Sequence, residues 1–191
     1  MSENKKPKRT QYPYLNVSIW THVWLRLPWL IVLLFGSVLA GALVTFYEPT
    51  FLKLPLLVAF IPLIMAIAGA GGSQTSTVII RSMVTGEITT KKYLKAFLKE
   101  FIISVIIGIA LGALMFGYVI SLYQNIMLGI VLWLGLIATV IFAKILGMFL
   151  PIMCKWLKID PAMVASPVVT ITADIFGIFA FFTFAQLILG V

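Results

Sequence analysis

Residues 62–81 read PLIMAIAGAGGSQTSTVIIR, a mostly apolar stretch with a run of small residues at its centre. All of it but the last residue, Arg81, lies within a segment from Leu54 to Ile80 that carries no charge. This segment exceeds the about 20 residues that cross the hydrocarbon core of a bilayer as a helix. Only 10% of the 191 residues are charged, against about 25% in a soluble domain. Because a chain this short exposes much of its surface, that surface must face lipid. The sequence therefore predicts an all-α membrane protein.

Four other apolar segments are long enough to span a membrane, near 27–47, 99–122, 126–150 and 167–189. The uncharged stretch 101–143 is too long for one helix, and we expect it to turn at Tyr123-Gln124-Asn125. We expect Pro151 to end the fourth helix, because proline fits poorly inside a continuing helix. Residues 28–191 are thus predicted to form five transmembrane helices of a multi-pass protein in the cell membrane.

The N-terminal region differs from the spans in its pattern. Apolar residues recur at helical spacing before the first span, which predicts an amphipathic helix over 14–27 lying in the membrane interface: Ile19, Trp20, Val23, Trp24 and Leu27. A plug against the cytoplasmic side of a pore is the alternative role for this helix. The polar, basic residues 1–13 are predicted to be disordered.

Basic residues alternate in number between the two sides of the predicted spans. They are frequent in 5–9, 81–99 and 155–158, whereas Lys53 stands alone on the opposite side. Lysine and arginine accumulate in cytoplasmic loops, so the N-terminus is predicted to be cytoplasmic. Since the basic residues flank apolar runs, the net charge of +8 indicates contact with lipid headgroups rather than with nucleic acid.

The sequence lacks the residues that several functional classes require. Cys154 and His22 are the only residues of their types, so one chain offers neither a thiolate cluster nor a histidine-rich metal site. The sequence shows no nucleophile paired with a base and no phosphate-binding loop. We therefore expect neither an enzyme nor a bound cofactor.

Asp174 is a charge inside the otherwise uncharged stretch 168–191. A carboxylate at this depth costs a few kcal/mol and persists where it meets water, an ion or a partner. Thr170 lies one turn earlier on the same helix face, and Thr172 lies nearby. The interpretation that we favour is a cation site; the alternative is a structural hydrogen bond or salt bridge between helices.

The small residues 68–72 (AGAGG) interrupt the second predicted span and are followed by the polar run 73–77 (SQTST). Small side chains let another helix approach closely, and glycine also lets a membrane helix open toward a water-filled cavity. Packing explains the glycines but not the polar residues after them. We therefore expect Gln74 and Thr77 to line a pore or an interface.

Lys144 is a second charge within a predicted span, about 10 Å inside the cytoplasmic end and at a depth similar to that of Asp174. One hypothesis is that it pairs with Asp174 and weakens the attraction for a cation. The other is that its long side chain snorkels to the headgroups.

Two segments resemble signature helices of MgtE-type divalent-cation channels. Residues 62–81 with Gly86-Glu87-Ile88 look like the second transmembrane helix of that family, and 160–177 look like the fifth. The resemblance covers nearly all of residues 20–191. It implies a homodimer with a pore on the two-fold axis and a hydrated divalent cation at a site formed by Asp174, Thr170 and the backbone of Gly69, Ala70 and Gly71.

The chain departs from the family pattern at specific positions. Ala68-Gly69-Ala70 stands where the family has Gly-Gly-Asn, so a polar amide is missing, and Thr170-Ile171 stands where it has Thr-Thr. The family's large cytoplasmic sensor region has no counterpart in these residues. The expected function is channel-like transport of divalent cations, Mg²⁺ first; the alternatives are a coupled Mg²⁺ exchanger and a non-conducting membrane scaffold or accessory subunit.

Overall fold

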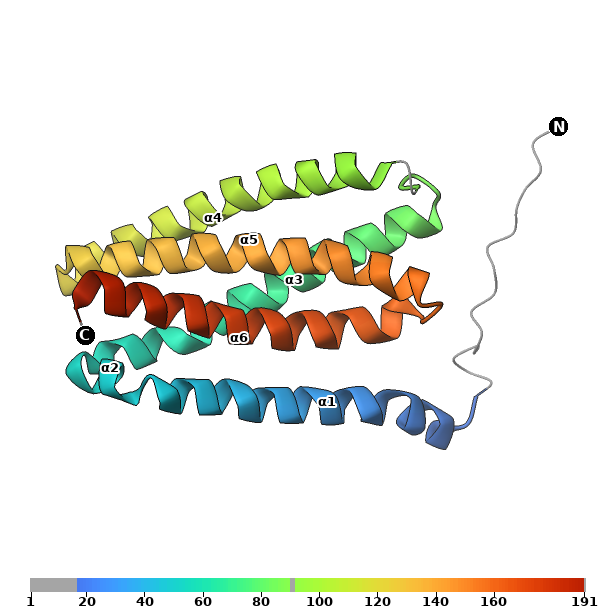
Figure 1. Ribbon diagram of the computed structural model, residues 1–191, viewed down its shortest axis with the longest axis horizontal. Helices are drawn as coiled ribbons and strands as arrows, with labels where there is room; N and C mark the ends of the chain where they lie inside the picture. The colour runs from blue at the N-terminus through green and yellow to red at the C-terminus, as the bar shows by residue number, and fades with distance from the viewer. Residues whose placement is uncertain (1–16, 90–91, 191) are drawn as a thin grey trace.

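The computed structural model describes residues 17–89 and 92–190, except for the side chains of 162 and 163, and this part of the chain is helical without a strand. The predicted disordered tail, 1–13, lies outside the described residues. In chain order the elements are α1 (Ile19–Phe46), α2 (Glu48–Lys53), the 3-10 helix η2 (Pro55–Phe60), α3 (Ile61–Val84), α4 (Tyr93–Tyr123), α5 (Ile126–Trp156) and α6 (Pro161–Leu189) (Figure 1).

Five stretches of the described chain are long and apolar enough to cross a membrane: Ile19–Phe46, Pro55–Val84, Tyr93–Tyr123, Ile126–Trp156 and Val164–Leu189. They confirm the all-α membrane fold and the number and order of the predicted spans. The predicted amphipathic segment is helical from Ile19 and runs without a break into the first span, with Pro28 inside α1. Trp20 and Trp24 in this segment are 71% and 70% exposed.

The turn between α4 and α5 falls where it was predicted. Gln124 ends α4 in the left-handed conformation with φ 50°, and the Asn125 side chain accepts a hydrogen bond of 3.0 Å from the Leu128 backbone N–H. An N-cap asparagine of this kind satisfies a donor that the first turn leaves free.

The predicted helix end at Pro151 is wrong, because α5 continues through it to Trp156. Proline removes the hydrogen bond to the carbonyl four residues earlier, here Gly147. Membrane helices accommodate this loss when neighbouring helices enclose the backbone, and both Pro151 and Gly147 are buried. Pro167 likewise lies inside α6, which begins at Pro161, before the predicted span.

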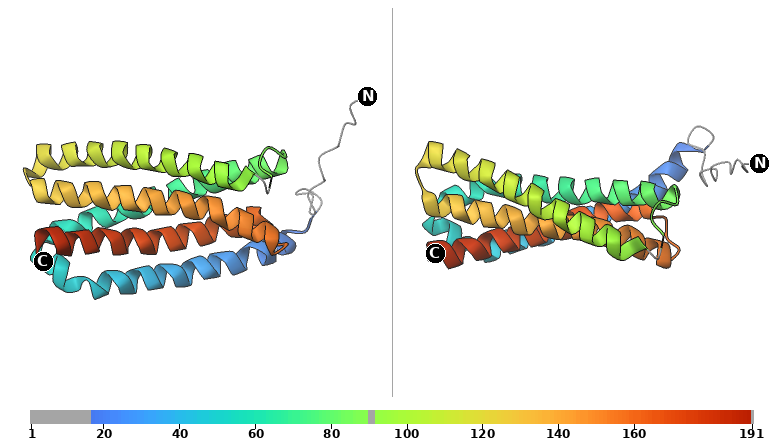
Figure 2. Two further views of the ribbon diagram at one scale, coloured as in Figure 1. Left: turned by 45° about the horizontal axis from the view of Figure 1, so that its top comes forward. Right: turned by 90° about the horizontal axis from the view of Figure 1, so that it is seen from above.

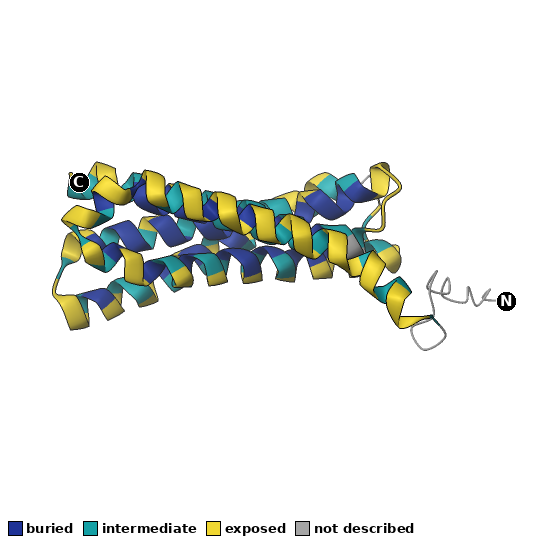
Figure 3. Ribbon diagram, turned by 90° about the horizontal axis from the view of Figure 1, so that it is seen from below, coloured by how far each residue is buried: buried dark blue, intermediate teal, exposed yellow. Residues whose placement is uncertain are grey.

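The helices form an elongated bundle in which α5 and α6 lie side by side and α3 crosses them at an angle (Figures 1 and 2). α4 packs on α5, and α1 packs on α6 where Gly36 meets Ile171. Half of the most apolar part of α5 is buried but only 11% of that of α1, so α5 is central and α1 peripheral. Figure 3 shows the same contrast as exposed bands on the outer helices.

The two ends of the bundle differ in charge. α1, α4 and α6 begin, and α3 and α5 end, at one end of the molecule (Figure 1). Most of the described basic residues lie at or within two turns of that end: Arg26, Arg81, Lys92, Lys95, Lys99, Lys155 and Lys158. Lys53 in α2 lies at the other. The unequal distribution of lysine and arginine among the predicted loops is therefore also an unequal distribution between the two ends of the bundle.

Candidate cation site

Asp174, Thr170 and Gly69 come together where α3 crosses and packs against α6. A methyl group placed on Gly69 would lie 3.1 Å from Thr170 Cγ2 and 3.6 Å from Asp174 Oδ1. One helical turn further along α3, the Ser73 hydroxyl lies 3.3 Å from that of Ser166 on α6. We call this line of contact, formed by these five residues, the α3–α6 seam. Three of the residues predicted to form the cation site thus share one place.

The carboxylate of Asp174 is incompletely satisfied within the chain. The side chain is half-buried, yet its Oδ1 is fully buried and has no hydrogen-bond partner in the described structure. A buried polar atom without a partner costs about 1–3 kcal/mol, and more when it is charged. The absence of a side chain at Gly69 lets α3 approach so closely that an added methyl group would already be in van der Waals contact with this oxygen. An acidic residue with an unpartnered oxygen inside a span is a candidate cation site.

A stripe of small and polar residues runs along the exposed face of α3 beside the seam. Gln74 and Thr77, predicted to line a pore or an interface, belong to it, and both are exposed. The members are spaced by three or four residues and so lie on one helix face. We call this set the α3 stripe: Ala66, Ala70, Gln74, Thr77 and Arg81.

Other predicted site residues do not meet Asp174 within one chain. Ala70 is exposed on the α3 stripe, and a methyl group on Gly71 would have no neighbour within 4 Å. Thr172 precedes Asp174 by two residues, which places it about 200° away around α6. The seam in this chain therefore includes Gly69 but not Ala70, Gly71 or Thr172.

The glycines do not open the backbone of this span, because α3 is an uninterrupted helix from Ile61 to Val84. The glycines instead allow close packing. A methyl group on Gly72 would lie 2.9 Å from the Ala143 carbonyl oxygen, and one on Gly147 would collide with the Gly72 carbonyl. These glycines hold α3 against α5 and leave no space for a side chain.

Lys144 follows neither of the two hypotheses for it. Its side chain is only 5% exposed, and Nζ donates a hydrogen bond of 3.3 Å to Thr75 Oγ1, which in turn donates one of 3.2 Å to Glu100 Oε2. No ion pair joins Lys144 to Asp174 in the part of the chain that the structure describes. Sequence reasoning missed Glu100, although an acidic residue inside the predicted span 99–122 was an available signal.

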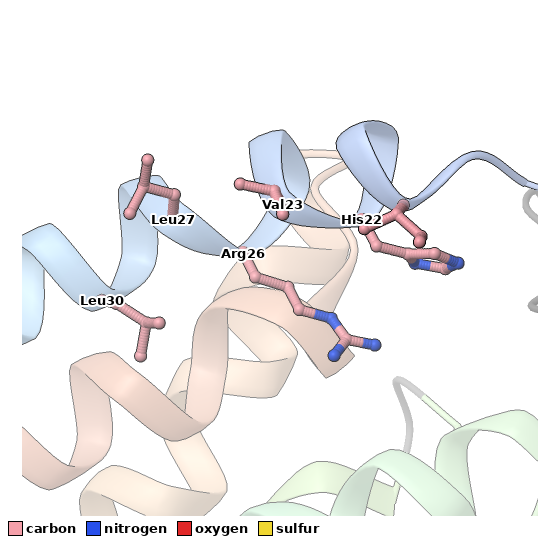
Figure 4. A pocket seen from close by; sticks show the side chains of 6 residues that line it. His22, Val23, Arg26, Leu27 and Leu30 are labelled. Carbon is pink, nitrogen blue, oxygen red and sulfur yellow. The ribbon is translucent and has the colours of Figure 1, made fainter.

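A separate pocket of about 390 Å³ lies along the start of α1, and Figure 4 shows the labelled Arg26 and His22 side chains there. Its described lining comes from α1 alone and includes no residue of the seam. No group of three or more histidine, cysteine, aspartate or glutamate side chains gathers anywhere among the described residues. A single chain therefore offers the seam one carboxylate.

Residues 61–184 match the MgtE family, described as divalent cation transporter. Magnesium transporter MgtE of Bacillus subtilis is 31% identical over 161 residues, which are 84% of this chain and 36% of that protein. The proteins of the same name from Thermus thermophilus and Enterococcus faecalis are each 28% identical, over 87% and 85% of this chain and 37% and 36% of their own lengths. The chain thus spans little more than a third of the curated relatives that it matches.

Proposed function

Because this chain belongs to the MgtE family of divalent cation transporters, we propose that it carries divalent cations, Mg²⁺ first, across the cell membrane along the α3–α6 seam. The observation that carries the proposal is the buried, unpartnered Oδ1 of Asp174 beside Thr170 and Gly69 in a membrane-spanning bundle. In such a bundle an acidic residue that lacks a partner belongs on an ion or proton path.

The residues of the seam fit a hydrated ion better than a dehydrated one. Mg²⁺ gives up its water reluctantly and is usually held by one or two carboxylates while keeping several waters. One carboxylate, from Asp174, and the hydroxyl of Thr170 can accept hydrogen bonds from such waters.

We further propose that the pore forms between two copies of the chain. One chain offers one carboxylate at the seam, and a two-fold axis would supply a second. The α3 stripe is poorly suited to lipid, because Gln74 exposes an amide within a span. Facing stripes from two copies would enclose a path whose walls are small or polar, with Gln74 and Thr77 along it and Asp174 at its edge.

The direction of insertion follows from the charged end of the bundle. We propose that the end carrying Arg81, Lys155 and Lys158 is cytoplasmic, since loops rich in lysine and arginine stay on that side. The N-terminus is then cytoplasmic as well. α1 would place Trp20 and Trp24 at the depth of the headgroups.

The test is transport by purified protein in liposomes that contain a Mg²⁺-sensitive dye. A channel gives Mg²⁺ entry driven by the Mg²⁺ gradient and membrane potential alone. Entry that requires a sodium or proton gradient would assign the protein to coupled exchange instead. No entry of any divalent cation under either condition would refute transport and favour the scaffold alternative.

A further inference from the structure

A second buried polar cluster lies on the side of α3 that faces away from Asp174. It joins Thr75 of α3 to Lys144 of α5 and Glu100 of α4 through the two hydrogen bonds already given, of 3.3 and 3.2 Å. Thr75 is 2% exposed and Lys144 is 5% exposed, whereas Glu100 is half-buried. We call these three residues the charge cluster.

The hydroxyl of Thr75 connects two opposite charges that do not touch directly. It accepts from the Lys144 ammonium and donates to the Glu100 carboxylate, so one side chain satisfies both. With both groups ionised the cluster is neutral. Loss of either charged partner would leave one uncompensated charge inside a span, which is strongly unfavourable.

The cluster lies close enough to the seam for its net charge to be felt there. Thr75 follows Gly69 by six residues, about 9 Å along α3 and about 240° around it. Lys144 is adjacent to Ala143, whose carbonyl oxygen packs against Gly72. With helix axes about 8–10 Å apart, the Lys144 charge lies on the order of 10–15 Å from Asp174. At that range a cation in the seam feels an unbalanced unit charge, since the membrane interior screens little.

We propose that Glu100 sets the affinity of the seam for divalent cations by neutralising the charge of Lys144. This inference rests on the proposed function. Without Glu100, the positive charge of Lys144 repels a cation at Asp174. Without Lys144, the negative charge of Glu100 attracts it. The two neutralising substitutions therefore act in opposite directions, whereas a role in helix packing alone would move both the same way.

The experiment compares Glu100→Gln, Lys144→Met and the double variant with the unsubstituted protein, measuring the initial rate of Mg²⁺ entry into liposomes against Mg²⁺ concentration. For an effective dielectric constant between that of water and about 20, one unit charge at this distance changes the affinity for a divalent ion by about tenfold. We expect E100Q to raise KM by about tenfold, K144M to lower it by a similar factor, and the double variant to return KM close to its original value.

Thr75→Val is the matched control, because it removes the bridging hydroxyl but keeps both charges. We expect T75V to lower the melting temperature in detergent while leaving KM within about twofold of the original. The single variants should also melt lower, and the double variant should recover part of that loss. If E100Q cannot be purified in a folded state, K144M decides alone, and a KM that rises or stays the same overturns the inference.

Asp174→Asn separates failure of this inference from failure of the proposed function. If D174N abolishes Mg²⁺ entry but the KM values of E100Q and K144M move together or not at all, the charge cluster does not tune the seam. If D174N transports like the original protein, the seam is not the cation site and the proposed function fails. The melting temperatures of the cluster variants would still report whether the buried charges compensate each other.

Discussion

Asp174→Asn is the sharpest perturbation of the proposed cation site, because it removes a charge with little change in shape. Oδ1 has no hydrogen-bond partner in the described structure, so the substitution breaks no internal hydrogen bond at that atom. Asparagine is also cheaper than an ionised aspartate to bury in a membrane. We therefore expect D174N to fold and to associate as the original chain does.

The size of the effect follows from the distance at which a hydrated ion can approach. A Mg–O distance of about 2.1 Å plus a hydrogen bond of about 2.8 Å puts the ion about 5 Å from the carboxylate oxygen. The interaction of a divalent ion with one unit charge at that distance is about 2 kcal/mol for a dielectric constant near 80 and about 7 kcal/mol for one near 20. Even the lower figure corresponds to more than tenfold in binding.

The assay is Mg²⁺ entry into liposomes, with the orientation and amount of protein matched between variants. Asp174→Glu serves as a control that keeps the charge but moves it by one methylene, and we expect it to retain more transport than D174N. Entry by D174N at more than about a third of the original rate, at Mg²⁺ well below KM, would refute the electrostatic reasoning. Loss of transport together with loss of the folded bundle would instead indicate a structural role.

Three further predictions address packing, assembly and the predicted turn. Gly147→Ala should destabilise the protein by about 1–3 kcal/mol, because its methyl group would collide with the Gly72 carbonyl, whereas Gly117→Ala, which has open space around it, should leave the melting temperature unchanged. In a Cys154→Ala background, we expect Gln74→Cys to form a disulfide between two copies in membranes. The control Ile106→Cys, at an exposed position of α4, should form none. A Q74C protein that stays monomeric yet transports Mg²⁺ would contradict the proposed dimer. Asn125→Ala should cost about 1 kcal/mol by removing the cap on α5, and Asn125→Asp, which keeps the oxygen acceptor, should restore most of it in thermal melts.

Hydropathy predicted the spans well because the requirement for about 20 apolar residues acts on each helix separately. The turn at Gln124 was equally accessible, since a polar pair interrupts an apolar stretch that is too long for one helix. Pro151 misled the prediction because proline was judged by its effect on an isolated helix. In the bundle its surroundings are buried helices, and α5 passes through it.

The polar residues inside the spans could be recognised in the sequence, but the residues that they contact were harder to predict. Asp174, Thr170 and Gly69 lie together, which the resemblance to the MgtE family implies. Spacing alone predicted only that Thr170 shares a helix face with Asp174. Lys144 and Asp174 lie within the fourth and fifth spans, as predicted. The depth of a residue in the membrane, however, does not determine which way its side chain faces. The rotation of α5 directs Lys144 toward Thr75 and Glu100, and that rotation is set by glycine contacts such as Gly147 with Gly72. Contacts of this kind depend on tertiary packing and leave no periodic signal.

The size and polarity of each side chain along α3 match the neighbouring helix that it faces. Successive residues of an α-helix are rotated by about 100° about its axis, so the side chains of nine consecutive residues together point in all directions around the helix. Gly69 faces Thr170 and Asp174 of α6, Gly72 meets the backbone of α5, and Thr75 joins the charges of α4 and α5. A side chain at Gly69 would press on Thr170 and Asp174, and one at Gly72 would separate two helices. Loss of the Thr75 hydroxyl would leave Lys144 and Glu100 without the hydrogen bonds that bridge them.

Ala70 and Gly71 face away from the other helices in the described part of the chain. Ala70 is exposed, and an added methyl group at Gly71 meets nothing within 4 Å. If α3 served a single chain alone, larger residues at these two positions would be harmless. In the proposed dimer they lie where the second copy approaches. Gly71→Leu should therefore weaken association and transport while leaving the fold of each chain intact, and a G71L protein that dimerises and transports normally would place the second copy elsewhere.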